Sequence, residues 1–394
     1  MLRLIVSVWM FFSVAQANIY VIPDDKSIAV KGKFARNKKC VRCHLDIYKE
    51  FKHSKHHNAN VLNNAAHKAM WEGNPLSKEQ KYVCAKCHAP AAEDIDALIS
   101  GAKAIDMKDK SMDDGISCAF CHRIESIHPT DKGDKYVISS QKRVYFGTRK
   151  SRQKSDFHKI RTDNPIYKTG DMCLTCHTHH KKQKLLILRD ENNETLRYCV
   201  FSHVDDNVTR TVKNTDEENC ITCHMPQVDG SFTDRFTTPT HAYHGFSALS
   251  SKMSDAQRYF DINLTQKSDG FDILLTNKVP HDLVLHPTRL FVLKIYLNGK
   301  LIKEKRYQKE SRTTKLEPLS WQKENVYYLH NLLAKRTDSI HIKESIKDGD
   351  SVKVVLGYYV TRPDVAKRVD LNDTKSTQYQ TLVEKNFTIH HKNK

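Results

Sequence analysis

The chain has 394 residues and carries 64 Lys and Arg against 46 Asp and Glu, a formal net charge of +18. With 28% charged and 39% hydrophobic residues, it is neither disordered by composition nor a multi-span membrane protein. Eleven cysteines are too few at this length for a small disulfide scaffold. The length predicts two or three domains, and the basic excess raises nucleic acid or an anionic membrane as partners.

The N-terminus has the pattern of a secretory signal peptide. Arg3 precedes an apolar run from Leu4 to Val14, and Ala15-Gln16-Ala17 supplies a small-residue cleavage site. The run is shorter than the roughly 20 residues that span a bilayer, although an uncleaved anchor is the alternative. We therefore expect cleavage after Ala17 and a mature chain in the periplasm, where nucleic acid is not a partner and a membrane is met only by association.

Ten of the eleven cysteines form five C-x-x-C-H motifs. This spacing is typical of covalent haem c attachment, in which both thiols form thioethers and the histidine is the proximal iron ligand. The predicted attachment residues are Cys40, Cys43, Cys84, Cys87, Cys118, Cys121, Cys173, Cys176, Cys220 and Cys223. The predicted proximal ligands are His44, His88, His122, His177 and His224. We therefore predict five covalently bound c-type haems.

Zinc sites or five disulfides would also use paired cysteines, but neither explains the histidine that follows each pair. With 22 histidines in 394 residues, chance places one after all five pairs with a probability on the order of 10⁻⁷ to 10⁻⁶. The eleventh thiol, Cys199, lies between aromatic neighbours. An inert packed cysteine is the favoured interpretation there, and a distal thiolate ligand is the alternative.

Seventeen further histidines are available as distal ligands, so bis-histidine coordination of every haem is possible but not required. Residues 45–70 are predicted to be helical and to present His56 or His57 to a neighbouring haem. His241 and His244 follow a Pro-punctuated loop, and His281 lies before a predicted strand. The distal candidates are thus His56, His57, His244, His241 and His281, with His286, His179 and His180 behind them.

The predicted fold class is α+β, with a mostly helical and coil pentahaem domain over 18–249 and an Ig-like β-sandwich over 250–394. The intervals between motifs are expected to hold short helices and no sheet, including 90–100 and a helix that a capping box at 215–218 opens and Pro226 ends. Residues 131–156 are predicted to form a basic loop. Period-2 patterns predict strands over 258–265, 271–276, 291–297, 300–305, 351–360 and 381–390, with a type I′ turn at Asn298-Gly299.

Several blocks resemble multihaem cytochromes of the cytochrome c-554 type. These are Cys40 to His44 with Ile47-Tyr48, Phe51 and Ser54-x-His56; Cys84 to Pro90; Gly115 to Cys118; and Cys220 to Pro226. The resemblance covers roughly residues 38–246. It implies closely packed, mostly bis-histidine haems, with His56 as a ligand of a haem other than that of the preceding motif, Cys40 to His44. The fifth haem and residues 250–394 depart from that family, and the absence of a C-x-x-C-K motif disfavours a pentahaem nitrite reductase.

The sequence therefore favours a periplasmic electron carrier between respiratory partners, such as a quinol-linked donor and a terminal reductase or acceptor. One alternative is a reductase of a small nitrogen or sulfur compound at a five-coordinate haem. Another is an electron-wire subunit whose sandwich binds a larger oxidoreductase. The basic segment with Lys142, Arg143, Arg149, Lys150 and Arg152 is expected to steer either an acidic redox partner or an anionic substrate.

Overall fold

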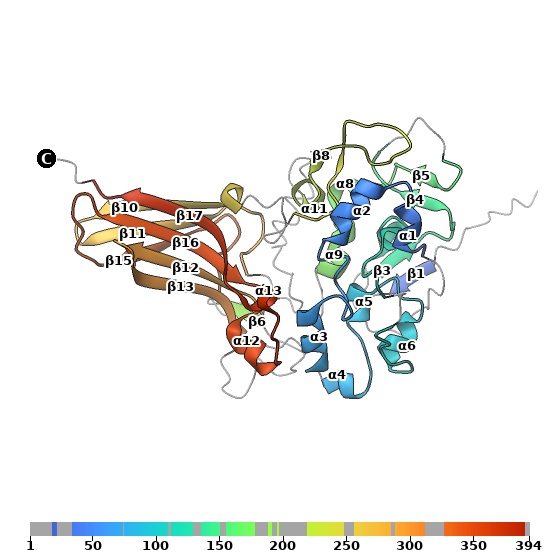
Figure 1. Cartoon of the computed structure of the whole chain (residues 1–394), viewed down its shortest axis with the longest axis horizontal. Coiled ribbons are helices and arrows are strands. Elements are labelled where there is room, and N and C mark those ends of the chain that lie inside the picture. Colours follow the sequence, from blue (N-terminus) through green and yellow to red (C-terminus); the bar gives the residue numbers. More distant parts are fainter. Residues whose placement is uncertain are drawn as a thin grey trace, which may run out of the picture.

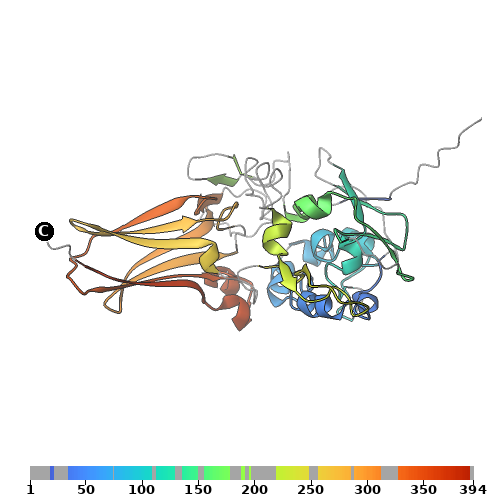
Figure 2. The same cartoon turned by 90° about the horizontal axis from the view of Figure 1, so that it is seen from above.

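The structure is a computed structural model of the whole chain (Figure 1). Helices gather in the part built from the first half of the sequence, and long strands in the part built from its last third, as both views show (Figures 1 and 2). The residues that the structure describes are 18–21, 34–73, 75–108, 112–128, 135–149, 155–177, 188–190, 195–196, 219–247, 256–284, 288–311 and 327–390. The predicted signal peptide, Cys199, His179, His180 and His286 lie outside these residues.

The N-terminal part is made of short helices joined by irregular segments. They are α1 Asn37–Cys40, α2 Leu45–Lys52, α3 Ala65–Glu72, α4 Pro75–Lys78, α5 Ala85–His88, α6 Ile95–Ser100, α7 Cys118–Cys121, α8 Ile166–Thr169, α9 Asp171–His177 and α11 Cys220–His224. Buried aromatic and aliphatic side chains from α3, α5, α6 and α7 form one core, with Tyr82 and Ile138 fully enclosed.

The continuous helix predicted over 45–70 is wrong, because the chain leaves the helix after Lys52. The Ser54 hydroxyl accepts a hydrogen bond from His57 N (3.0 Å), and the Asn58 amide donates to the carbonyl oxygens of Lys52 (3.2 Å) and Ser54 (3.0 Å). Such short polar side chains compete with the helical backbone for partners. A second helix then starts at Ala65, where the Asn64 side chain caps His67 N at 3.0 Å.

The absence of sheet between the motifs was also a wrong prediction. Between the third and fourth motifs, β2 Ile124–His128 pairs with β3 Lys135–Ile138, which also pairs with β1 Asn18–Val21, and β4 Val144–Phe146 pairs with β5 Lys159–Arg161. A further pair, β8 Gln227–Asp229 with β9 Thr240–Ala242, follows the fifth motif. Parts of the predicted basic loop over 131–156 are therefore strands β3 and β4. Val144 and Phe146 are buried against Tyr167, so apolar residues within the charged segment decide its local structure.

The C-terminal part contains two sheets, and most of the strands predicted for it are present. One sheet has the order β10-β11-β15, with β10 Phe260–Lys267, β11 Gly270–Asn277 and β15 Thr337–Ile342. The other has the order β17-β16-β12-β13-β14-β6-β7. Its strands are β12 Leu290–Leu297, β13 Lys300–Ser311, β14 Tyr327–His330, β16 Ser351–Tyr359 and β17 Gln380–Thr388, together with β6 Leu188–Asp190 and β7 Thr195–Leu196.

The two C-terminal sheets share one hydrophobic core. Ile262, Ile273 and Ile340 from the smaller sheet belong to the same buried cluster as Leu293 and Val354 from the larger one. The β12–β13 turn was predicted correctly, since Asn298 and Gly299 have φ of 48° and 83°, as a type I′ turn requires. β6 is an unexpected member, because residues 188–190 pair in parallel with β14 from far along the chain.

Among the described residues, none of the helices is long and apolar enough to cross a membrane.

Candidate haem-binding site

Each C-x-x-C-H motif lies on or beside a short helix, so its cysteines and histidine project from one side. In three motifs the histidine amide donates to the carbonyl oxygen of the first cysteine, at 3.0 Å for His44, 2.9 Å for His88 and 3.0 Å for His122. Residues four apart in a helical turn lie on the same face. The local fold therefore presents two thiols and one imidazole to the same space.

The helix of the fifth motif begins at Cys220, later in the chain than predicted. The predicted capping box at 215–218 lies outside the described residues. Asn219 is the N-cap, with its side chain accepting from Ile221 N (2.9 Å) and Thr222 N (3.0 Å), while the Thr222 hydroxyl accepts from Asn219 N (2.8 Å). The predicted end of the helix is confirmed, because Met225 is the C-cap residue before Pro226.

None of the ten motif cysteines is paired in a disulfide. Burial raises the pKa of the Cys84 thiol to about 11 and that of the Cys121 thiol to about 12. Cysteine side chains of different motifs also lie beside each other, Cys40 with Cys118, Cys87 with Cys176, and Cys173 with Cys220. The motifs are therefore gathered around one interior despite their wide separation in the sequence.

Four motif histidines donate a hydrogen bond from Nδ1 to a backbone carbonyl oxygen. The acceptors are Phe232 for His44 (2.6 Å), Ala59 for His88 (2.8 Å), Phe146 for His122 (2.7 Å) and Ser247 for His224 (2.5 Å). A carbonyl oxygen only accepts, so the proton resides on Nδ1 and Nε2 keeps a lone pair. This second contact is the usual way in which a metal-binding imidazole is oriented.

Each of the five motif histidines has a second histidine close to its ring. The centroid separations are 6.2 Å for His44 and His158, 6.1 Å for His122 and His244, 5.9 Å for His177 and His56, 6.3 Å for His224 and His281, and 4.1 Å for His88 and His67. With a metal–nitrogen bond of about 2 Å and about 1.1 Å from nitrogen to ring centroid, two imidazoles on opposite sides of one iron have centroids about 6.2 Å apart. Four pairs have that spacing.

The residues therefore fit the haem iron that the motifs imply. Burial lowers the pKa of His56 and of His244 to about 3 and that of His281 to about 4, which keeps these imidazoles in the neutral form that binds metals. Nδ1 of His158 is buried and has no hydrogen-bond partner in the described part of the chain. A buried polar atom without a partner is expected where a further group completes the site.

Not all of the predicted distal candidates approach a motif histidine. His56, His244 and His281 do. The His57 ring instead packs edge-on against the Phe51 ring, with 5.5 Å between centroids, so His57 is not paired with a motif histidine. His158 and His67 were missed by the sequence reasoning, because His158 lies in a basic loop and His67 inside a helix, and neither has a local pattern that marks a ligand.

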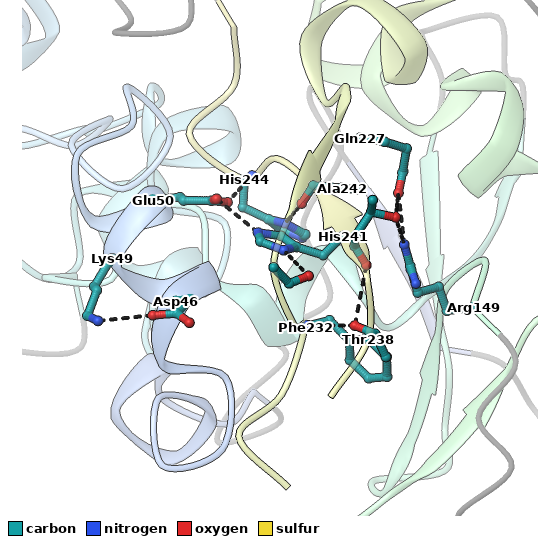
Figure 3. A network of polar contacts seen from close by, with 12 residues as sticks. Asp46, Lys49, Glu50, Arg149, Gln227, Phe232, Thr238, His241, Ala242 and His244 are labelled. Carbon is teal, nitrogen blue, oxygen red and sulfur yellow. Dashed lines mark hydrogen bonds and ion pairs between the residues drawn. The ribbon is translucent and has the colours of Figure 1, made fainter. Parts of the chain in front are cut away.

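His241 is held by Glu50 and does not face a motif histidine (Figure 3). Its Nδ1 lies 3.0 Å from the carbonyl oxygen of Gly230 and its Nε2 lies 2.9 Å from Glu50 Oε1, so both ring nitrogens are already in contact with oxygen acceptors. The other oxygen of Glu50 accepts from His244 N at 2.8 Å, and His244 Nδ1 donates to Ala242 O at 2.7 Å. Glu50 and His241 thus orient His244, whose Nε2 is left free.

A glycine sets the position of His56. Gly115 has φ of +60°, and a Cβ at this position would collide with the carbonyl oxygens of His56 and His57. The next residue donates from Ile116 N to His56 O at 3.2 Å. Only glycine adopts this backbone conformation without strain and leaves room for the two segments to meet.

Residues 39–123 match the family model described as cytochrome c554 and c-prime. The matched stretch contains the first three C-x-x-C-H motifs, and the similarity supports haem c attachment in this part of the chain. No curated protein matches the sequence.

The fold of the chain is similar to that in the crystal structure of a penta-heme cytochrome c552 from Thermochromatium tepidum. The two share 15% sequence identity with a TM-score of 0.66, over 91% of this chain and 99% of that chain. The likeness therefore extends beyond the family match into the C-terminal sheets.

Proposed function

We propose that the protein is a multihaem c-type cytochrome, a pentahaem electron carrier in which each C-x-x-C-H motif holds one haem through its two cysteines and its histidine. When bound, the haem iron accepts and donates single electrons. The observation that carries the proposal is the recurrence of a second histidine at about 6.2 Å, the spacing of two axial imidazoles. His158, His244, His56 and His281 would then hold the irons together with His44, His122, His177 and His224, respectively.

The contacts between motifs support an order for the relay. Motif 1 meets motif 3 through Cys40 and Cys118, and α1 packs on α7. Motif 4 meets motif 5 through Cys173 and Cys220, and Cys121 of motif 3 lies near Cys173 and Cys176 of motif 4. Motif 2 joins at motif 4, where Cys87 contacts Cys176. We therefore propose a line through motifs 1, 3, 4 and 5, with motif 2 as a branch.

We further propose that residues 250–394 form an Ig-like domain beside a haem domain over 18–249. The order β17-β16-β12-β13 opposite β10-β11-β15 matches the GFCC′ and ABE strands of that architecture. The separate hydrophobic cores of the two parts support the division. We propose a periplasmic location with residues 1–17 as a cleaved signal peptide, because c-type haem attachment and the N-terminal pattern agree.

The haem count and coordination can be measured on the purified full-length protein. The proposal expects five haems per chain by haemochrome assay and mass, and at least four low-spin ferric centres by electron paramagnetic resonance (EPR). A reductive titration should consume five electrons per chain. Fewer than five haems, or mainly high-spin centres, would contradict it.

The second motif favours a second candidate function, reduction of a small nitrogen or sulfur compound. Its paired rings, His88 and His67, are only 4.1 Å apart, too close for one iron between them. His67 Nε2 is hydrogen-bonded to the hydroxyl of the fully buried Tyr82 at 2.9 Å. If this contact persists with haem bound, that iron keeps an open side beside His67 and Tyr82, where a substrate would bind.

Ligand binding tests this second function. One of the five haems should be high-spin and should change its spectrum on addition of nitrite, hydroxylamine or cyanide, and Tyr82→Phe should alter that response. Five low-spin haems with no spectral response would show that His67 ligates iron instead, leaving electron transfer alone.

A further inference from the structure

The segment that carries His158 is strongly basic. Residues 141–161 contain eight Lys or Arg and one acidic residue, Asp156. Among the described cations, Arg161 pairs with Asp163 at 2.8 Å, and Arg149 donates to Gln227 (2.9 Å) and Thr240 (2.8 Å), the Gln227 contact being visible in Figure 3. Arg143 donates to backbone carbonyl oxygens only, so its charge and those of Lys142 and Lys159 have no acidic partner in the described part of the chain. Lys150, Arg152 and Lys154 lie outside the described residues.

Strands β4 and β5 arrange this segment so that its apolar face is inside and its charges are outside. Val144 and Phe146 are buried, whereas Lys142, Arg143 and all of β5 are exposed. Two large apolar side chains are exposed with them, Phe157 at 65% and Ile160 at 43%. A surface that combines cations with exposed apolar residues has the composition of a protein contact.

The same surface lies directly over a proposed iron ligand. His158 stands between Phe157 and Lys159 in the chain and points inward, 5.3 Å from the Tyr145 ring and 6.2 Å from the His44 ring. Arg143 fixes the preceding loop by donating to the carbonyl oxygens of Phe157 (2.9 Å) and Asp156 (2.6 Å). A molecule docked on this surface is therefore separated from the motif 1 site by one layer of side chains.

We propose that Lys142, Arg143, Phe157, Lys159 and Ile160, the β4–β5 surface, dock an acidic redox protein that exchanges electrons with the haem of motif 1. The inference rests on the proposed electron-carrier function and names its partner. One electron passes per encounter: the reduced partner is oxidised by one equivalent and one ferric haem becomes ferrous, with no bond formed or broken. Cationic residues attract an acidic partner at long range, and the two apolar side chains provide close contact.

The position of the surface supports this role. In both views β4 and β5 lie at the end of the molecule opposite the C-terminal sheets (Figures 1 and 2). The His224–His281 pair uses a residue from the loop that follows β11, at the C-terminal side. Motif 1 therefore serves as one terminus of the proposed line, and the motif 5 site is its other end.

The test uses the haem-loaded full-length protein and a reduced plant-type [2Fe–2S] ferredoxin, a small acidic one-electron donor. Lys142→Glu/Lys159→Glu changes two exposed side chains that have no hydrogen bond or ion pair in the described part of the chain. Lys300→Glu/Lys303→Glu on β13 is the matched control, with the same change in net charge on an exposed strand of the C-terminal sheet. Stopped-flow absorbance gives the second-order reduction rate as a function of ionic strength.

We expect the wild-type rate to fall steeply with salt, and the β4–β5 variant to be slower at low salt by about tenfold or more with a flatter salt dependence. The control variant should stay within about twofold of wild type. An equal effect of both variants, or of neither, would overturn the docking site. Binding of phosphatidylglycerol vesicles through Lys142 and Lys159, without an effect on the ferredoxin rate, would overturn it in favour of a membrane contact.

Reduction by neutral lumiflavin hydroquinone separates this proposal from the electron-carrier function. All variants should be reduced by lumiflavin at the wild-type rate. If the wild-type protein itself were not reduced by lumiflavin, the electron-carrier function would fail. If lumiflavin reduces every variant while ferredoxin does not distinguish them, only the docking proposal fails.

Discussion

His158 provides the sharpest test of the ligand assignment, because only its position in space identifies it. In the structure, four motif histidines have a second histidine at 5.9–6.3 Å, and His158 supplies one of these four. Replacing it with alanine removes one axial imidazole and leaves Cys40, Cys43 and His44 in place. We therefore expect His158→Ala to keep all covalent haem and to lower the number of low-spin bis-histidine centres from four to three.

Integrated EPR intensity against a low-spin standard, with the haem content measured on the same sample, gives this number. The appearance of a high-spin ferric signal of equal weight should accompany the loss. His57→Ala is the matched control, since His57 is a half-buried histidine of the same part that packs on Phe51 and approaches no motif histidine. Retention of four low-spin centres in His158→Ala, or loss of one in His57→Ala, would refute the use of ring separation to assign ligands.

Three further predictions concern positioning and stability. In Glu50→Gln, a neutral amide replaces the carboxylate that contacts His241 Nε2 and His244 N. We expect the free energy of unfolding to fall by about 1–3 kcal/mol and the EPR signal of one low-spin haem only to shift. Unchanged spectra would exclude a role of Glu50 in orienting His244. Gly115→Ala places a Cβ against the backbone of His56. We expect the free energy of unfolding to fall by about 1–3 kcal/mol, together with loss of the low-spin centre that His56 would supply. If neither the stability nor the low-spin centre changed, the steric argument would be contradicted. On β15, His341 donates to Asp272 (2.7 Å), and this contact raises the pKa of His341. Its stabilising contribution is then complete below its unfolded pKa of about 6.5 and is lost as pH rises through the folded pKa. His341→Gln should therefore lower the denaturation midpoint at about pH 5.5 and have little effect at about pH 8.5, and the opposite order would refute the sign.

The candidate haem-attachment residues follow from the sequence because they form short-range patterns. Two thiols and an imidazole at fixed spacing lie on one helical turn, so five repeats of Cys-x-x-Cys-His predict where haem would attach without any knowledge of the fold. Alternating apolar residues likewise predicted β10, β11, β12, β16 and β17, and Asn298-Gly299 predicted the turn between β12 and β13. Both signals depend only on neighbours in the chain. The helix over 45–70 failed because Ser54 and Asn58 satisfy the backbone in a non-helical way.

The second histidine of each pair could be decided only by the tertiary structure. His158 and His44 are 114 residues apart in the numbering (158 − 44) and meet only because β5 pairs with β4 above motif 1. His241 and His244 look equivalent in the sequence, yet Glu50 from α2 accepts from the ring of His241 and leaves only His244 facing His122. Residues 188–190 join the sheet that contains residues 290–388 through a parallel pairing with β14. Each of these contacts joins distant segments through packing and hydrogen bonds that no local pattern encodes, so sequence alone determines which groups are available and the fold determines which of them meet.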